Sequence, residues 1–217
     1  MPLMMPQRAG YSRAETLSDM MVHAVGLAAA LMAVPVLITL TWAQAGGLAL
    51  VGVSIYGATL VAMILCSTLY NMAHSARWSE MLRQMDHSAI YLKIAGTYTA
   101  FALAAAQPAG WFLVWIWGCA LLGAGLRSLA PNRFRGAAIT LYLVMGWSGA
   151  VAGGALFADM SSRAFGLILA GGILYTAGFG FYVSPRLRFH RTIWHGFVMT
   201  ASAVFFAAVM VHVLAGA

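Results

Sequence analysis

The sequence predicts an all-α membrane protein, a polytopic bundle of seven transmembrane helices. Of the 217 residues, 62% are hydrophobic and only 8% are charged, which is far below the charged fraction of a soluble domain. Apolar stretches of about 20 residues, the length that crosses a hydrocarbon core as a helix, recur along the whole chain. We therefore expect a multi-pass protein that has lipid as its main solvent.

Seven expected spans follow one another with short links between them. They cover residues 20–43, 48–70, 89–106, 111–129, 136–157, 164–182 and 193–215. Links this short make consecutive helices antiparallel neighbours, so residues 20–217 are expected to form a single seven-helix domain. Residues 1–19 form a leader in which Ser12 and Glu15 have the spacing of a capping box. That spacing predicts a short surface helix before the first span.

The basic residues indicate how the bundle is oriented. If the N-terminus is cytoplasmic, Lys93 lies within a span and Arg163 lies outside. The other ten of the twelve basic residues then lie on the cytoplasmic side, where membrane proteins carry an excess of Lys and Arg; they are Arg8, Arg13, Arg77, Arg83, Arg127, Arg133, Arg135, Arg186, Arg188 and Arg191. We expect a cytoplasmic N-terminus and an outside C-terminus, in the cell inner (plasma) membrane.

The net charge of +7 does not indicate a nucleic-acid partner. The basic residues are spread through short connections and form no basic arm or patch, which is the feature that binds a phosphate backbone. Cys66 and Cys119 lie deep within the second and fourth spans, and we expect both to be free thiols. A membrane lipid is the expected partner. A homo-oligomer stays open, and the sequence names no protein partner.

Polar side chains converge at the cytoplasmic ends of three spans. Ionisable groups inside spans are costly, and they are therefore candidates for function. The residues are Ser67, Asn71 and His74 of the second span, Asp86 and His87 of the third, and His190, Arg191 and His195 of the seventh. Ser67 and Asn71 are four residues apart and share a helix face, as do Arg191 and His195. We expect one polar centre built around Asn71, Asp86 and His195.

Three of the polar residues near this level have ordinary structural explanations, which we prefer for them. Asp19 and His23 lie at a similar depth at the start of the first span, and we interpret Asp19 as a cap of that helix. We interpret His87 as a contact with lipid headgroups and His74 as part of a solvated loop.

The segments that carry these residues resemble the hemolysin III family, the bacterial branch of the progestin and adipoQ receptor family. The similarity covers YSRAETLSDMMVHAVG, CSTLYN, LRQMDHSAIYLKIAGTYTAF, RFRGAAITLYLVMGWSG and IWHGFV. The resemblance implies seven helices with a cytoplasmic N-terminus, which agrees with the orientation inferred from the basic residues.

The resemblance also implies a zinc site, which this sequence has altered. Members of the family typically hold zinc with one histidine from S-x3-H in the second span and two from H-x3-H in the seventh. Here the motifs run from Ser67 to Asn71 and from Arg191 to His195, so only His195 remains. A neutral amide is a poor zinc ligand and arginine cannot ligate. Two further positions depart from the family, which usually has an apolar residue at Lys93 and often a histidine at Phe205.

From these changes we expect no metal cofactor. Our hypothesis is that fixed cations replaced the ion: Arg191, with Lys93, neutralises Asp86, because a buried carboxylate in a membrane needs such a partner. Asn71 and His195 complete the hydrogen-bonded cluster, with Ser67 beside them. The alternative is a shifted Zn²⁺ site made of His195, His74 and His190.

Three functions are compatible with this sequence. The first is a non-catalytic protein that binds or senses a membrane lipid through the cavity of the bundle, or that has a regulatory role. The second, implied by the resemblance, is a metal-dependent hydrolase of an amide or ester in a membrane lipid, with Asp86 accepting a proton and Ser67 steadying the oxyanion. The third is a membrane-perturbing hemolysin, which is disfavoured because the spans are polar only near their inner ends.

Overall fold

The computed structural model describes residues 12–72, 76–105, 110–129, 135–152, 154–157 and 160–215. All regular structure in these residues is helical, so the all-α class is confirmed. The helices are α1 (Arg13–Gln44), α2 (Gly47–Met72), α3 (Ala76–Ala104), α4 (Gly110–Leu129), α5 (Arg135–Ala152), α6 (Gly154–Phe157), α7 (Ser162–Tyr182) and α8 (His190–Ala215).

Five helices, α1, α2, α4, α7 and α8, are long and apolar enough to cross a membrane, and α5 contains a shorter apolar stretch. The protein is therefore a polytopic membrane bundle, as predicted. The expected fifth span, residues 136–157, is described as α5 followed by the four-residue α6.

The start of α1 confirms the capping box but not a separate surface helix. The Ser12 backbone N–H donates to the Glu15 carboxylate at 2.9 Å, and the Glu15 backbone N–H donates to the Ser12 hydroxyl at 3.2 Å. From there α1 runs without a break to Gln44. The prediction of a short, separate helix was wrong, because no proline or glycine between Arg13 and Val25 interrupts the chain.

The third helix begins thirteen residues earlier than the expected span. Its first three turns are polar and are stabilised by contacts of Glu80. Arg83 donates to the Glu80 carboxylate at 2.7 and 3.1 Å, and Gln84 donates to it at 3.2 Å. The Arg83 guanidinium lowers the pKa of the Glu80 carboxyl. Pairs spaced by three or four residues stabilise a helix that hydropathy alone does not reveal.

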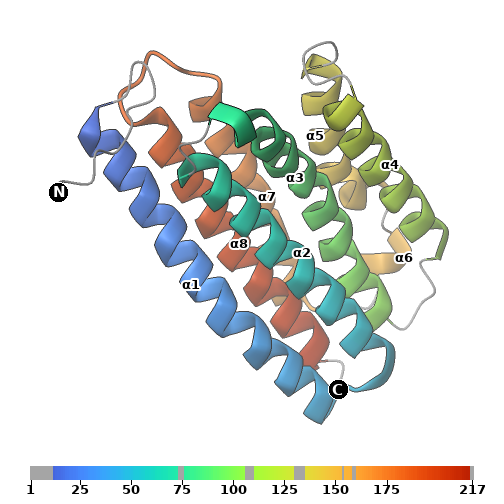
Figure 1. Ribbon diagram of the computed structural model, residues 1–217. Helices are drawn as coiled ribbons and strands as arrows, with labels where there is room; N and C mark the ends of the chain where they lie inside the picture. The colour runs from blue at the N-terminus through green and yellow to red at the C-terminus, as the bar shows by residue number, and fades with distance from the viewer. Residues whose placement is uncertain are drawn as a thin grey trace.

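The helices pack so that the first and the last are neighbours. α1 lies against α2 and α8, α2 lies against α3, and α8 contacts α1, α2, α3 and α7. α4 and α5 lie on the far side of α3 (Figure 1). Helices α1, α3, α5 and α8 begin at one end of the bundle, uppermost in Figure 1, where α2, α4 and α7 finish. We call it the basic end, because eight arginines of the described residues lie there: Arg13, Arg77, Arg83, Arg127, Arg135, Arg186, Arg188 and Arg191.

Side chains tie α1 to α8 at the basic end. The Glu15 carboxylate accepts a hydrogen bond from the Phe189 backbone N–H at 3.0 Å, one residue before α8 begins. Phe189 has φ 59°, a left-handed conformation that side chains other than glycine seldom adopt. One turn further, the hydroxyls of Ser18 and Thr192 lie 3.0 Å apart. These contacts set the register in which the next turns of α1 and α8 face each other.

Candidate functional site

The first part of the site comes from α1. Asp19 and His23 are four residues apart, so they lie on one face of the helix. His23 is fully buried. Its Nδ1 lies 2.8 Å from the backbone carbonyl oxygen of Asp19. Because a carbonyl only accepts, the His23 Nδ1 carries the proton and donates.

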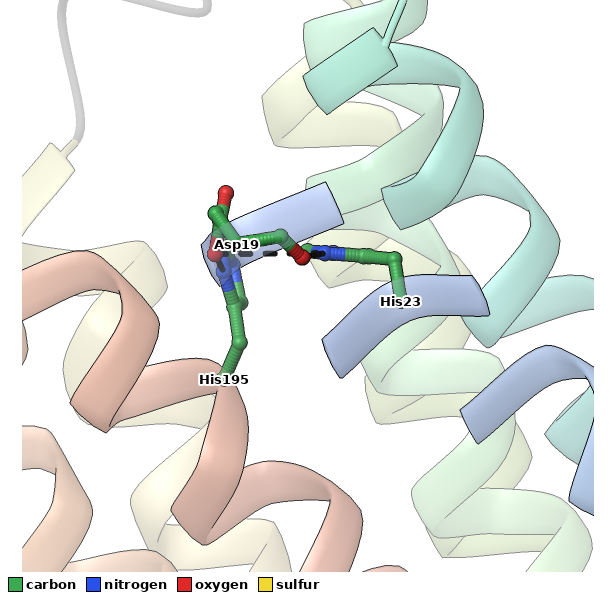
Figure 2. Close-up of side chains that lie close together, drawn as sticks. All are labelled: Asp19, His23 and His195. Atoms are coloured by element: carbon green, nitrogen blue, oxygen red, sulfur yellow. Dashed lines mark hydrogen bonds and ion pairs between the residues drawn. The ribbon is translucent and has the colours of Figure 1, made fainter. Parts of the chain in front are cut away.

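The second part comes from α8. The His195 Nδ1 lies 2.5 Å from Oδ1 of the Asp19 carboxylate, the shortest polar contact at the site. The rings of His195 and His23 meet edge to face, with centroids 4.4 Å apart. Figure 2 shows the Asp19 carboxylate beside the imidazole of His195 from α8, with the imidazole of His23 from α1 close by. The acid of α1 therefore has a partner on the last helix of the bundle.

The third part comes from α2. The Asn71 amide nitrogen lies 3.3 Å from the His23 Nε2 and donates to the Ser67 carbonyl at 2.9 Å. The Ser67 hydroxyl lies 3.1 Å from the same Nε2. Because Nδ1 holds the proton of a neutral imidazole, Nε2 accepts from these donors.

The Arg191 guanidinium of α8 completes the network. Its Nη2 donates to the Asn71 Oδ1 at 2.8 Å. An arginine only donates, so this bond places the amide oxygen of Asn71 toward α8 and its nitrogen toward His23. We call the connected residues the polar chain: Arg191, Asn71, Ser67, His23, Asp19 and His195.

The three zinc-ligand positions implied by the resemblance do not fit a metal ion. Asn71 and Arg191 occupy two of them, and they are bonded to each other. A guanidinium keeps its proton at any ordinary pH and repels a dication. Only His195 offers a ligand of the kind that zinc prefers, and its Nδ1 is engaged with Asp19.

A different set of side chains does have the chemistry of metal ligands. Each of the residues Asp19, His23 and His195 offers one atom that could bind a metal, and these three atoms lie within 4.8 Å of one another. A carboxylate and two imidazoles are suitable ligands for Zn²⁺. In the polar chain, however, Nδ1 of both rings is committed to a hydrogen bond with Asp19, and Arg191 brings a fixed cation to the same network.

Four of the predicted centre residues are therefore brought together: Ser67, Asn71, Arg191 and His195. Asp86 lines the same cavity as Arg191, and the predicted neutralisation of Asp86 by Arg191 stays a prediction. Of the alternative zinc ligands, His190 is buried, with its Nδ1 3.1 Å from the Leu187 carbonyl. His74 lies outside the described residues.

Lys93 lies apart from the polar chain. Its side chain is 3% exposed, and its Nζ lies 4.8 Å from the ring centroid of Tyr175 and 4.6 Å from that of Phe205. Within the described part of the chain, its ammonium makes no hydrogen bond to the residues around Asn71.

The residues that sequence reasoning missed are Asp19 and His23. Asp19 was interpreted as a helix cap, but Ser12 caps α1 and Asp19 pairs with His195 instead. The available signal was the spacing of Asp19 and His23 by four residues at the same depth as the other polar side chains.

A cavity of about 720 Å³ adjoins the polar chain. Ser67, Arg191 and His195 line it at one end. Most of the remaining lining is apolar or aromatic and comes from α2, α3, α5, α7 and α8, with the charged Lys93 of α3 and Arg127 of α4 among it. Trp147 of α5 and Thr176 of α7 are both exposed and both belong to the lining. The Trp147 indole N–H donates to the Thr176 hydroxyl at 3.3 Å. The cavity therefore reaches the outer surface of the bundle between α5 and α7.

Comparison with known proteins gives a consistent result. Residues 12–206 match the family described as Haemolysin-III related. The chain is 36% identical over 202 residues to Hemolysin-3 of Bacillus cereus, covering 92% of each chain. It is 34% identical over 198 residues to the Hemolysin-3 homolog of Bacillus subtilis (strain 168), covering 90% of this chain and 93% of the relative.

A human relative matches over a shorter region. The chain is 29% identical over 165 residues to the human monocyte to macrophage differentiation factor, covering 71% of this chain and 67% of the relative. The seven long helices and the matched segments agree with one another. The chain belongs to the Haemolysin-III related family, and it is an integral membrane protein of that family.

Proposed function

We propose that this protein is a non-catalytic, lipid-binding membrane protein whose polar centre works without a metal ion. The observation that carries the proposal is the 2.8 Å hydrogen bond from Arg191 to Asn71. It joins two positions at which the resemblance implies zinc ligands. A permanent cation there takes the electrostatic place of an ion beside the Asp19 carboxylate.

The polar chain supports this proposal because it is satisfied by its own members. Asp19 accepts from His195, His23 donates to the Asp19 backbone, and Asn71 bridges His23 and Arg191. A buried network of connected hydrogen bonds stabilises one arrangement of its helices. Its role in this proposal is to hold α1, α2 and α8 together at the basic end.

The cavity supports the lipid-binding part. Its volume of about 720 Å³ lies within the ~300–1,000 Å³ that is usual for ligand sites, and such sites are mostly apolar with a few polar groups. The lining is mostly apolar and carries a few polar and charged side chains, which suits a molecule with a polar head and a hydrocarbon tail. The opening at Trp147 and Thr176 lets such a molecule enter from the bilayer.

The proposal includes an orientation. We place the basic end in the cytoplasm and the C-terminus outside the inner membrane, because the arginines at that end follow the positive-inside rule. The polar chain would then face the cytoplasmic leaflet.

Metal analysis of the purified full-length protein tests the metal-free centre. We expect substoichiometric zinc in the wild type after purification without chelators. The double variant Asn71→His, Arg191→His supplies two imidazoles beside His195, and it is expected to copurify with stoichiometric zinc. This variant is the matched control, since it shows that the preparation retains a metal when ligands are present. One tightly held zinc per wild-type chain would defeat the proposal.

A second candidate function rests on the cluster of Asp19, His23 and His195. If these side chains held Zn²⁺, the ion would supply an activated water for hydrolysis of a lipid ester or amide. Asp86 and Ser67 line the adjoining cavity and are available to move a proton and to donate to an oxyanion. A lipid-hydrolysis assay of the wild type against His195→Ala and Asp86→Ala separates the candidates. Hydrolysis lost in both variants favours this enzyme, and no wild-type hydrolysis favours the binding protein.

A further inference from the structure

Lys93 is a charged side chain deep in the bundle that the polar chain does not use. It lies near the middle of α3, seven residues beyond Asp86, which is about 10 Å further from the basic end along a helix. The side chain is 3% exposed and lines the cavity. Lys93 therefore presents a cation to the interior of the cavity at the depth of the hydrocarbon core.

The described surroundings of Lys93 offer its charge no hydrogen-bond acceptor. The Nζ lies over the rings of Tyr175 and Phe205, at 4.8 and 4.6 Å from their centroids. Among the residues that the structure describes, no hydrogen bond or ion pair reaches this ammonium, which has three N–H donors. Contacts with ring faces offset only part of the cost of a buried charge. An anion in the cavity would supply the missing partner.

The net charge of the cavity lining also favours an anionic ligand. Four of its side chains are basic, Arg83, Lys93, Arg127 and Arg191, and one is acidic, Asp86. Arg127 is 6% exposed, and its Nε has no hydrogen-bond partner within the described residues. The lining therefore carries more positive than negative charge around an otherwise apolar space.

One opening of the cavity, between α5 and α7, lies near the level of Lys93. The neighbouring glycines of α7 show this: a Cβ on Gly171 would lie 2.7 Å from the Phe205 ring, and one on Gly172 would lie 3.6 Å from the Trp147 ring. Phe205 contacts Lys93 and Trp147 bounds the opening. A ligand that enters between α5 and α7 therefore meets Lys93 directly.

The route of entry limits the chemistry of the anion. A head group that passes through hydrocarbon must be neutral on the way, because a charge in that medium is costly. A carboxylic acid meets this condition in its protonated form, whereas a sulfate monoester stays charged. In the cavity the acid gives its proton to water, and the carboxylate that remains pairs with the Lys93 ammonium.

We propose that Lys93 is the head-group site of this cavity and selects a long-chain carboxylic acid over a neutral lipid of the same chain length. The inference rests on the proposed lipid-binding function and adds its specificity. The carboxylate binds the Lys93 ammonium between Tyr175 and Phe205, and the tail lies along the apolar lining of α3, α7 and α8.

Equilibrium binding tests this site. Purified full-length protein in a neutral detergent is titrated with radiolabelled palmitic acid, and unlabelled palmitic acid or hexadecanol is used as competitor. In the wild type we expect palmitic acid to compete at least about tenfold better than hexadecanol, equivalent to about 1.4 kcal/mol. Lys93→Met is expected to bind both competitors alike, and Lys93→Arg, which keeps the charge, is expected to keep the preference.

Further variants make the outcome decisive. Arg83→Met is the matched control, because Arg83 is a lining cation already paired with Glu80, and it is expected to keep the preference. Lys93→Gln replaces Lys93→Met if the latter does not fold. A preference that survives removal of the Lys93 charge, or that is lost in Arg191→Met instead, overturns the proposal. Equal binding of both lipids by the wild type overturns the head-group site but leaves lipid binding intact, whereas no binding of either defeats the proposed function as well.

Discussion

Arg191 changes the chemistry of the polar centre through a single side chain. A metal ion can dissociate or exchange, and imidazole ligands can take up protons, but a guanidinium keeps its charge under physiological conditions. Its bond to Asn71 therefore places a permanent cation in the network that joins α8 to α2. The proposed metal-free centre predicts that its structure does not depend on metal supply.

The contact between Asp19 and His195 leads to a prediction about stability. Asp19→Asn removes the charged acceptor of the His195 Nδ1 proton and is expected to lower the free energy of unfolding by about 2 kcal/mol, typical of a hydrogen bond to a charged group. Thermal unfolding in detergent measures the loss. Glu80→Gln is the matched control, because its pair with Arg83 is exposed, and little change is expected there. Equal losses in the two variants would contradict a structural role for Asp19.

Sequence reasoning located the polar centre by depth but could not assign its pairs. Ser67, Asn71, Arg191 and His195 were expected together, and they are connected. Which acid faces His195 depends on how α1 and α8 are rotated against each other, and hydropathy carries no information on that rotation. Both Asp19 and Asp86 lie near the depth of His195, so the sequence alone does not show which of the two acids contacts it. The packing of the helices decides this.

Glycines let α7 and α8 approach closely, and the contact can be tested within one helix. A Cβ added at Gly178 would lie 2.6 Å from the Cβ of Phe197, an atom next to the backbone that cannot move aside freely. Gly178→Ala is therefore expected to destabilise the protein by about 1–3 kcal/mol through overpacking.

Gly166 provides the control for that substitution on the same helix. No atom lies within 4 Å of a Cβ placed there, so Gly166→Ala is expected to be neutral or to stabilise by up to about 1 kcal/mol through helix propensity. Thermal unfolding of both variants in one detergent measures the difference. If Gly166→Ala proves as harmful as Gly178→Ala, close packing of α7 on α8 is not the cause.

The lengths of the elements show where hydropathy is insufficient. The apolar runs predicted the spans of α2 and α7 to within a few residues. The polar first turns of α3 were missed because Glu80, Arg83 and Gln84 stabilise that helix through their own side chains. The capping-box spacing at Ser12 predicted where a helix begins, but it carried no information that this helix continues to Gln44.

The orientation of the whole bundle is a prediction that reporter fusions can check. Alkaline phosphatase folds into an active enzyme only outside the inner membrane, and green fluorescent protein matures in the cytoplasm. With a cytoplasmic N-terminus and seven crossings, a C-terminal phosphatase fusion is expected to be active and a C-terminal fluorescent fusion dark. Fusions placed after α2, near Met72, are the matched controls and should give the opposite pattern. A fluorescent C-terminal fusion with an inactive phosphatase fusion would contradict this orientation.

At the scale of the molecule, the sequence predicted how many long helices there are and that consecutive ones are antiparallel. It did not predict that α8 would lie between α1 and α7 and also contact α2 and α3. That arrangement brings Asp19 and His195, which are 176 positions apart, into contact. Such a long-range pair depends on the packing of side chains over the whole bundle, which no local pattern encodes.

The adjacency of α1 and α8 has a consequence for synthesis. A ribosome makes α8 last, so the first helix is formed before the His195 imidazole that Asp19 contacts exists. The contact that joins the two ends of the chain is therefore among the last to form during synthesis.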